Sequence, residues 1–207
     1  MNLTSKRDYL KKVYGPVGFA AARFHIPPNL ITLVSLILGS ISAYFFYNHR
    51  PMAGAVLLAI SGILDLADGM VARLNDKASK FGAVFDWLAD KWVDGLVLGS
   101  IGLAYSSPLI ALLAVTSSML HSFIKPVAYA EIGFSERIKG KIKDPLENVG
   151  FFGRPETHIT ILIFSLIESV NLPLGLGFGI KAIAFLTLIS LFMRLVYLFK
   201  KYGREYE

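Results

Sequence analysis

Residues 65–90 read DLADGMVARLNDKASKFGAVFDWLAD and lie in one of the most apolar regions of the chain. They include five aspartates and one arginine, flanked on both sides by long hydrophobic runs. A short polar turn at residues 75–80 separates two segments with helical periodicity, which predicts two antiparallel helices. Burying charged side chains between apolar helices is costly, so this stretch indicates a functional site in which the acids bind an ion or a ligand.

The composition of the chain indicates a membrane protein. The 207 residues are 54% hydrophobic, and their mean hydropathy is +0.55. Cysteine is absent, which excludes disulfides and thiolate metal sites. The net charge is +6, but the basic residues gather at the ends of apolar runs and not on a soluble face. We therefore expect no nucleic acid partner.

Six apolar stretches approach or exceed the roughly 20 helical residues that cross a bilayer. They cover residues 29–48, 52–73, 82–105, 108–131, 156–172 and 178–199. Sixteen of the 21 Lys and Arg residues then fall on one side, so the positive-inside rule places both termini in the cytoplasm. The sequence predicts an all-α polytopic membrane protein with six transmembrane helices in the cell membrane.

The segment before the first span is expected to lie in the membrane interface. Within residues 1–28, apolar side chains recur at helical spacing among lysines, at Tyr9, Leu10, Val13, Tyr14 and Val17. Asn29 is expected to cap the first transmembrane helix. The transmembrane domain is predicted to span 29–199, a cytosolic tail to cover 200–207, and a polar loop to occupy 132–155.

The spacing of four aspartates predicts a metal site. Asp65 and Asp68 are three residues apart and Asp86 and Asp90 are four apart, so each pair lies on one helix face. Antiparallel helices would bring the pairs to a similar depth, roughly 10 Å below the cytosolic surface. Four carboxylates cannot all stay ionised there without cations. Oxygen ligands favour magnesium, manganese or calcium over zinc.

Other interpretations of these acids are open. They could pair with local bases such as Arg73 and Lys91. They could also form the ion pathway of a divalent-cation or cation-coupled transporter, although transporter sites lie near the midplane between repeated halves and no repeat is evident here. A membrane scaffold without catalytic activity is a third possibility.

Small residues beside the acids favour a bound ligand. Gly69 directly follows one aspartate and Gly82 precedes another by one turn, although an interior helix glycine costs about 1 kcal/mol relative to alanine. A missing side chain lets a ligand approach the backbone, and tight helix packing is the alternative for each glycine singly. Ala72 extends the same face, and Arg73 offers a fork for a phosphate.

Eight residues of this stretch share one spacing pattern: Asp65-x-x-Asp68-Gly69-x-x-Ala72-Arg73, eight further residues, then Gly82-x-x-x-Asp86-x-x-x-Asp90. This motif of 26 residues resembles the signature of the CDP-alcohol phosphotransferase (CDP-alcohol phosphatidyltransferase) family, with all eight positions present. The resemblance implies a membrane enzyme that displaces CMP from a CDP-linked alcohol with a second alcohol and so forms a phosphodiester.

The resemblance also implies residue roles and a homodimer. Two divalent cations, magnesium or manganese, would be held by Asp65, Asp68, Asp86 and Asp90. The CDP group would be bound by Asp65, Asp68, Gly69, Ala72, Arg73 and Gly82. Asp90 would be the catalytic base. Asp94, one turn further, departs from the minimal signature, and we expect a structural or proton-sharing role for it. Small residues at 39–43 are a candidate dimer face.

Three further basic residues bear on the acceptor alcohol. Lys125, Arg154 and Arg194 fall towards the cytosolic ends of three different spans, where each singly could be an ordinary positive-inside charge. Together they are predicted to clamp an acceptor phosphate, as in family members that use inositol phosphate, and His158 could join them. We expect a CDP-lipid donor and a water-soluble acceptor in phospholipid synthesis, with inositol phosphate, glycerol phosphate and serine as open alternatives.

Overall fold

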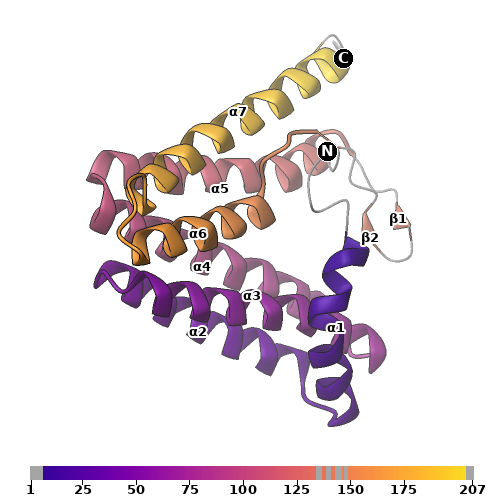
Figure 1. The fold of residues 1–207 in the computed structure, drawn as a ribbon. Coiled ribbons are helices and arrows are strands. Elements are labelled where there is room, and N and C mark those ends of the chain that lie inside the picture. The colour runs from indigo at the N-terminus through magenta and orange to yellow at the C-terminus, as the bar shows by residue number, and fades with distance from the viewer. Residues whose placement is uncertain (1–6, 134–136, 139–140, 143–145, 147–148, 204–207) are drawn as a thin grey trace.

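The computed structural model describes residues 7–133, 137–138, 141–142, 146 and 149–203 (Figure 1). Within this part of the chain there are seven helices and one short pair of strands, so the predicted all-helical class is confirmed. The helices and strands are α1 (Arg7–Arg23), α2 (Pro28–Tyr47), α3 (Pro51–Leu74), α4 (Lys80–Tyr105), α5 (Pro108–Glu131), β1 (Arg137–Ile138), β2 (Lys141–Ile142), α6 (Arg154–Ser169) and α7 (Leu176–Tyr202).

Helices α2 to α7 match the six apolar stretches, and every boundary lies within three residues of the predicted one. Four of them, α2, α3, α5 and α7, are long and apolar enough to cross a membrane, as expected of an integral membrane protein. Helix α4 has 26 residues but carries charged side chains along its first half, and α6 has only 16 residues. Six crossings therefore stay a prediction.

Prolines and serines define where the helices begin. Pro28, Pro51 and Pro108 occupy the first turns of α2, α3 and α5, where a missing N–H costs nothing. Ser79 caps α4 and accepts a hydrogen bond from the Gly82 N–H at 2.9 Å. The predicted cap at Asn29 is wrong, because α2 already begins at Pro28 and Asn29 lies inside its first turn.

The bundle is built around α3 and α4, which do not pack closely on each other in the described part of the chain. Helix α2 packs along both of them, α6 packs against α3, and α5 packs against α4 (Figure 1). Helix α7 then covers α4, α5 and α6. The apolar core lies between these helices and includes Phe46, Leu58, Ile101, Ile161 and Ile180.

The small residues of α2 are used inside the chain. Gly39, Ser42 and Ala43 are buried, and a Cβ at Gly39 would lie 2.6 Å from the side chain of Val93. The Ser42 hydroxyl donates to the Gly54 carbonyl at 2.7 Å. The predicted dimer face at 39–43 is therefore corrected at its small buried residues: Gly39, Ser42 and Ala43 let α2 approach α3 and α4 closely and are not available to a second copy, whereas Ile41 is exposed.

Helix α1 crosses the bundle at one end of α2 and α3 (Figure 1). It packs against α3, and Ala21 and Ala22 form a small buried cluster with Ile31 and Val71. Of the predicted apolar positions, Tyr14 is half-buried and Val17 is exposed, whereas the side chains of Tyr9, Leu10 and Val13 lie outside the described residues. Of the predicted loop 132–155, the structure describes residues 132–133, the β1–β2 pair, 146 and 149–155, and the rest lies outside the described residues.

Candidate metal and substrate site

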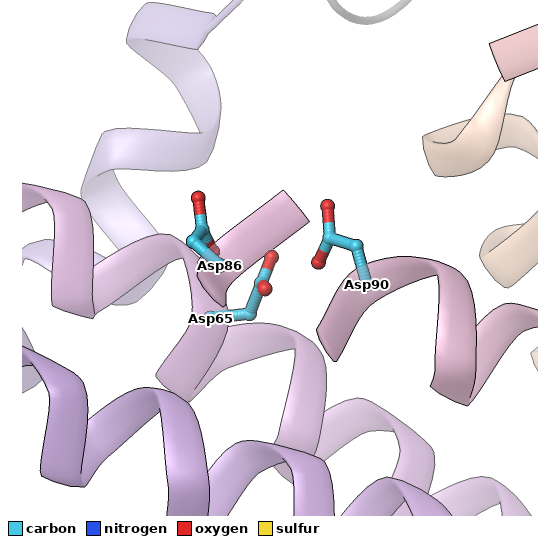
Figure 2. A group of neighbouring side chains, drawn as sticks. All are labelled: Asp65, Asp86 and Asp90. Carbon is cyan, nitrogen blue, oxygen red and sulfur yellow. The ribbon is translucent and has the colours of Figure 1, made fainter. Parts of the chain in front are cut away.

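Three of the four motif aspartates come together at the site. Figure 2 shows the carboxylates of Asp65 from α3 and of Asp86 and Asp90 from α4 directed towards one another. One carboxylate oxygen from each lies within 4.8 Å of the others. This spacing suits a hard cation that takes oxygen ligands from several carboxylates.

The connection between α3 and α4 explains this convergence. The Lys77 N–H donates to the Ala72 carbonyl at 2.9 Å, and Asp76 adopts a left-handed conformation with φ 52°, which aspartate tolerates better than most residues. The chain reverses within a few residues. Helix α2 packs along both α3 and α4, and the acids of these two helices face one another where α3 and α4 do not pack closely.

Arg154, at the first position of α6, lies against the acidic cluster. Its Nη1 is 2.8 Å from Asp65 Oδ2 and 2.8 Å from Asp90 Oδ1, and its Nε is 3.1 Å from Asp94 Oδ1. Asp90 Oδ1 is buried, and its contact with Arg154 does not meet hydrogen-bond geometry, so it has no hydrogen-bond partner among the described residues. A buried carboxylate oxygen with unused acceptor capacity fits a cation ligand.

The contacts of Asp68 differ from those of the three clustered aspartates. Its Oδ2 accepts a hydrogen bond of 2.5 Å from the Thr32 hydroxyl of α2, and the residue is 4% exposed. Asp68 is not one of the three clustered carboxylates, and it faces a cavity together with Asp86. Its role as a metal ligand stays a prediction.

The cavity next to Asp68, here called the motif cavity, has a volume of about 460 Å³. Its lining includes Asn29, Thr32, Asp68, Gly69, Ala72, Arg73, Gly82 and Asp86. A Cβ at Gly69 would meet only Arg73 Nη1, at 3.4 Å, so this glycine keeps the cavity open and is not required for helix packing. A Cβ at Gly82 would lie 3.0 Å from Asn29 Oδ1 and from Ser79 Oγ. Five of the six residues predicted to bind CDP share this cavity, and Asp65 does not line it.

A second cavity, here called the basic cavity, has a volume of about 440 Å³. It is lined among others by Asp90, Lys91, His121, Lys125, Arg154 and Arg194. The structure thus brings the three predicted phosphate-binding cations to one cavity. Arg194 is 3% exposed, and it also donates from Nη1 to the His121 carbonyl at 2.7 Å and from Nε to the Val149 carbonyl at 3.1 Å.

Neither Asp94 nor His158 lines this cavity, but Asp94 contacts two residues that do. The Asp94 carboxylate contacts Lys91 Nζ at 3.1 Å, Arg154 Nε at 3.1 Å and His158 Nε2 at 3.2 Å. Lys91 therefore pairs with Asp94, whereas Arg73 lines the motif cavity. His158 lines an apolar cavity shared with Asp65 and Tyr14, on the side of α6 that faces α1 and α3.

The sequence did not predict that Thr32 and Asn29 line the motif cavity. A signal was present, because Thr32, Ser35, Gly39 and Ser42 repeat at intervals of three and four within an apolar helix, which predicts a buried polar face. The contact of Thr32 with Asp68 joins residues that are 36 positions apart, and spacing alone could not indicate it.

Comparison with known proteins identifies the family. A family model described as CDP-alcohol phosphatidyltransferase matches residues 25–202. The archaetidylinositol phosphate synthase of Pyrococcus horikoshii is 27% identical over 199 residues, covering 96% of this chain and 97% of that protein. The bifunctional IPC transferase and DIPP synthase of Archaeoglobus fulgidus is 35% identical over 71% of this chain, but the match spans only 29% of that longer protein.

Solved structures agree with the fold. The crystal structure of Mycobacterium tuberculosis phosphatidylinositol phosphate synthase (PgsA1) with CDP-DAG bound has a TM-score of 0.73 at 23% identity, covering 91% of this chain and 94% of that one. The same protein has been solved in complex with manganese and citrate. At this identity the likeness shows that the two proteins share a fold.

The proteins matched above are transferases and synthases of one family, so they confirm the predicted enzyme class and give no support to the transporter alternative. The family model spans both cavities and the acidic cluster between them. This chain is a member of the CDP-alcohol phosphatidyltransferase family.

Proposed function

We propose that this enzyme transfers the phosphoryl-alcohol part of a CDP-linked lipid to a phosphorylated polyol of the inositol phosphate type, with release of CMP. The observation that carries the proposal is the position of the acidic cluster between two cavities. Asp86 lines the motif cavity and Asp90 lines the basic cavity, so neighbouring turns of α4 face both. A donor in the first cavity and an acceptor in the second would meet at the carboxylates.

The choice of acceptor rests on charge and on the relatives. Lys125, Arg154 and Arg194 come from three helices to one cavity, where an anionic group could accept charge-assisted hydrogen bonds. The names of the Pyrococcus and Mycobacterium relatives both specify inositol phosphate lipids. Glycerol phosphate would present a similar anion, whereas serine would leave these cations without a phosphate partner.

Asp65, Asp68, Asp86 and Asp90 would hold two divalent cations, magnesium or manganese. The clustered oxygens and the unused acceptor capacity of Asp90 fit such ions. When bound, the cations would neutralise pyrophosphate charge and stabilise the departing phosphate. Gly69, Ala72 and Gly82 would leave room for the cytidine nucleotide, and Arg73 would contact its phosphates.

Asp90 would act as the general base. The acceptor hydroxyl oxygen forms a bond to the phosphorus that carries the lipid alcohol, and its proton passes to Asp90. The pyrophosphate P–O bond opposite the attacking oxygen breaks, and CMP leaves with the bridging oxygen and the bonding electron pair. The product is a phosphodiester between the lipid and the acceptor, and the proton on Asp90 then returns to solvent.

The topology is part of the proposal. Helices α2 to α7 would make six crossings within a catalytic domain at 29–199, and residues 1–28, including α1, would lie in the interface. The positive-inside rule would place both termini, the tail at 200–207 and the opening of the site in the cytosol. Helix α7 continues to Tyr202, so the first residues of that tail are helical. A homodimer is expected from the family resemblance.

The test is CMP release by the purified enzyme in detergent with magnesium or manganese. Donors carrying phosphatidyl and archaetidyl lipids would each be combined with inositol phosphate, inositol, glycerol phosphate, glycerol and serine. We expect phosphorylated polyols to be used much better than their free alcohols, and inositol phosphate to be the best acceptor. Preference for a free alcohol or serine would overturn the acceptor assignment, and no CMP release with any pair would overturn the reaction.

A further inference from the structure

We propose that Asp94 is a positioning residue that fixes the guanidinium of Arg154 between the acidic cluster and the basic cavity. The proposal rests on the proposed function, because it assigns Arg154 to acceptor binding. Asp94 lies outside the motif and lines neither cavity. Its effect on the reaction would therefore act through Arg154.

The contacts of Asp94 converge on one side of Arg154. Asp94 Oδ1 accepts from Arg154 Nε at 3.1 Å and lies 3.2 Å from His158 Nε2, while Oδ2 accepts from Lys91 Nζ at 3.1 Å. The Asp94 side chain is only 5% exposed. A buried carboxylate that meets three donors has little freedom to move, so it provides a fixed point for the arginine.

Carboxylates contact the guanidinium of Arg154 at two of its nitrogen atoms. Nε contacts Asp94, and Nη1 lies 2.8 Å from both Asp65 and Asp90. Because the five N–H groups of a guanidinium share one plane, contacts at Nε and Nη1 together set its orientation. Arg154 lines the basic cavity in this orientation, with its side chain 25% exposed.

Helix packing alone would not hold this arrangement. Within the described part of the chain, α4 and α6 do not pack closely on each other, and α6 packs instead on α3 and α7. The contacts of Asp94 with Arg154 and His158 therefore link α4 directly to the first turns of α6. Without Asp94, Arg154 would keep only its Nη1 contacts with Asp65 and Asp90 and could turn towards the acids.

The expected effect of Asp94→Asn is selective for the acceptor. The variant keeps the shape of the side chain but loses the charge that attracts Arg154 and Lys91. Loss of a side chain that orients a metal ligand typically costs about 10- to 100-fold, and we take this range as the scale for a side chain that orients Arg154. We expect the KM for inositol phosphate to rise by roughly tenfold or more, with little change in the Kd of the CDP-lipid donor.

A double-mutant cycle separates positioning from structural support. If Asp94 acts through Arg154, Asp94→Asn should raise the acceptor KM in the wild type and have little further effect in Arg154→Ala. Additive effects in the cycle, an unchanged acceptor KM, or an equal loss of donor binding would each overturn the proposal. His158→Phe removes another contact of Asp94 Oδ1 and should give a smaller rise in acceptor KM that also disappears in Arg154→Ala.

Two further measurements make the outcome decisive. Glu168 lies at the far end of α6, where its carboxylate accepts the Leu176 N–H at 2.8 Å, so Glu168→Gln is a matched control that should leave both substrate constants unchanged.

Thermal unfolding in detergent identifies a purely structural role, in which Asp94→Asn lowers Tm without raising the acceptor KM. If Asp94→Asn does not fold, His158→Phe alone tests the inference in the same cycle. Failure of the wild type to release CMP would contradict the proposed function instead.

Discussion

The motif cavity and the basic cavity lie on two sides of the same carboxylates but are assembled in different ways. The motif cavity is formed mainly by residues 68–86 and by the first turn of α2. The basic cavity takes its cations from α4, α5, α6 and α7, which are far apart in the sequence. One cavity is thus encoded by a short local pattern, and the other exists only after the bundle has formed.

The two cavities also differ in what holds their side chains. Arg73 contributes to the motif cavity from an exposed position on α3. In the basic cavity, Arg154 is bound by three carboxylates, and Arg194 is buried and donates to two main-chain carbonyls. The basic cavity therefore depends on a polar network, and a single change there should alter both binding and packing.

The largest effect is expected at the carboxylates shared by both cavities. Asp86→Asn removes a charged ligand from the cluster, and metal binding contributes several kcal/mol to such transfers, so CMP release should be abolished. Treatment with a chelator should abolish turnover, and magnesium or manganese should restore it. The matched control is Asp76→Asn in the exposed turn, where asparagine also tolerates the left-handed backbone. Full activity in a chelator would contradict the metal assignment.

The next effect tests whether the cavities have separate substrates. Gly69→Leu should fill the motif cavity and abolish donor binding, because nothing but Arg73 Nη1 lies near a Cβ at this position. Asp90→Asn should retain donor binding but lower the transfer rate by roughly 10²- to 10⁴-fold, as expected for loss of a general base. Donor titration and CMP release measure the two steps. Equal loss of donor binding in both variants would show that the division is wrong.

The sequence predicted the local pattern, and its topology also brought Lys125, Arg154 and Arg194 to one cavity, but it missed individual contacts between distant helices. The boundaries of α2 to α7 followed from apolar length, and residues 65–90 placed Asp65, Asp86 and Asp90 near one another through helical spacing. Spacing could not show that Asp68 is bound to Thr32, or that Asp94 contacts Arg154 across 60 positions. Those contacts depend on how helices pack, which a pattern within one helix does not encode.

For small residues, spacing within a helix does not decide between helix packing and ligand access. Glycines in membrane helices serve close packing as well as ligand access, and the pattern is the same for both. In the structure, Gly69 faces the motif cavity, whereas Gly39 lies against Val93 inside the bundle. Only the surroundings of each missing side chain distinguish the two uses.

An intermediate effect should appear in the basic cavity. Arg154→Ala removes charge-assisted contacts worth about 1.5 to 3 kcal/mol each, so the KM for a phosphorylated acceptor should rise by roughly ten- to a hundredfold. Arg154→Lys should rescue only partly, because lysine lacks the planar fork. Acceptor and donor KM values, measured separately, check the result. An unchanged acceptor KM would remove Arg154 from the acceptor site and leave the metal-dependent reaction intact.

The smallest effect is expected where the motif cavity depends on a contact outside the motif. The Thr32 hydroxyl donates to Asp68 Oδ2 at 2.5 Å and also lies 3.2 Å from the Pro28 carbonyl, so it links the first turns of α2 to the acids of α3. Thr32→Val keeps the shape of the side chain and removes the donor. A hydrogen bond to a charged group contributes about 1.5 to 3 kcal/mol, and 1.4 kcal/mol corresponds to a factor of about ten.

We therefore expect Thr32→Val to lower kcat/KM for the donor by about tenfold and to raise the magnesium concentration needed for half-maximal activity. The acceptor KM should change little, because Thr32 does not line the basic cavity. Thr32→Ser retains the hydroxyl and should stay close to the wild type, although it loses a buried methyl group. If Thr32→Val matched Thr32→Ser in every constant, Asp68 would not depend on α2. The motif cavity would then be set by residues 68–86 alone.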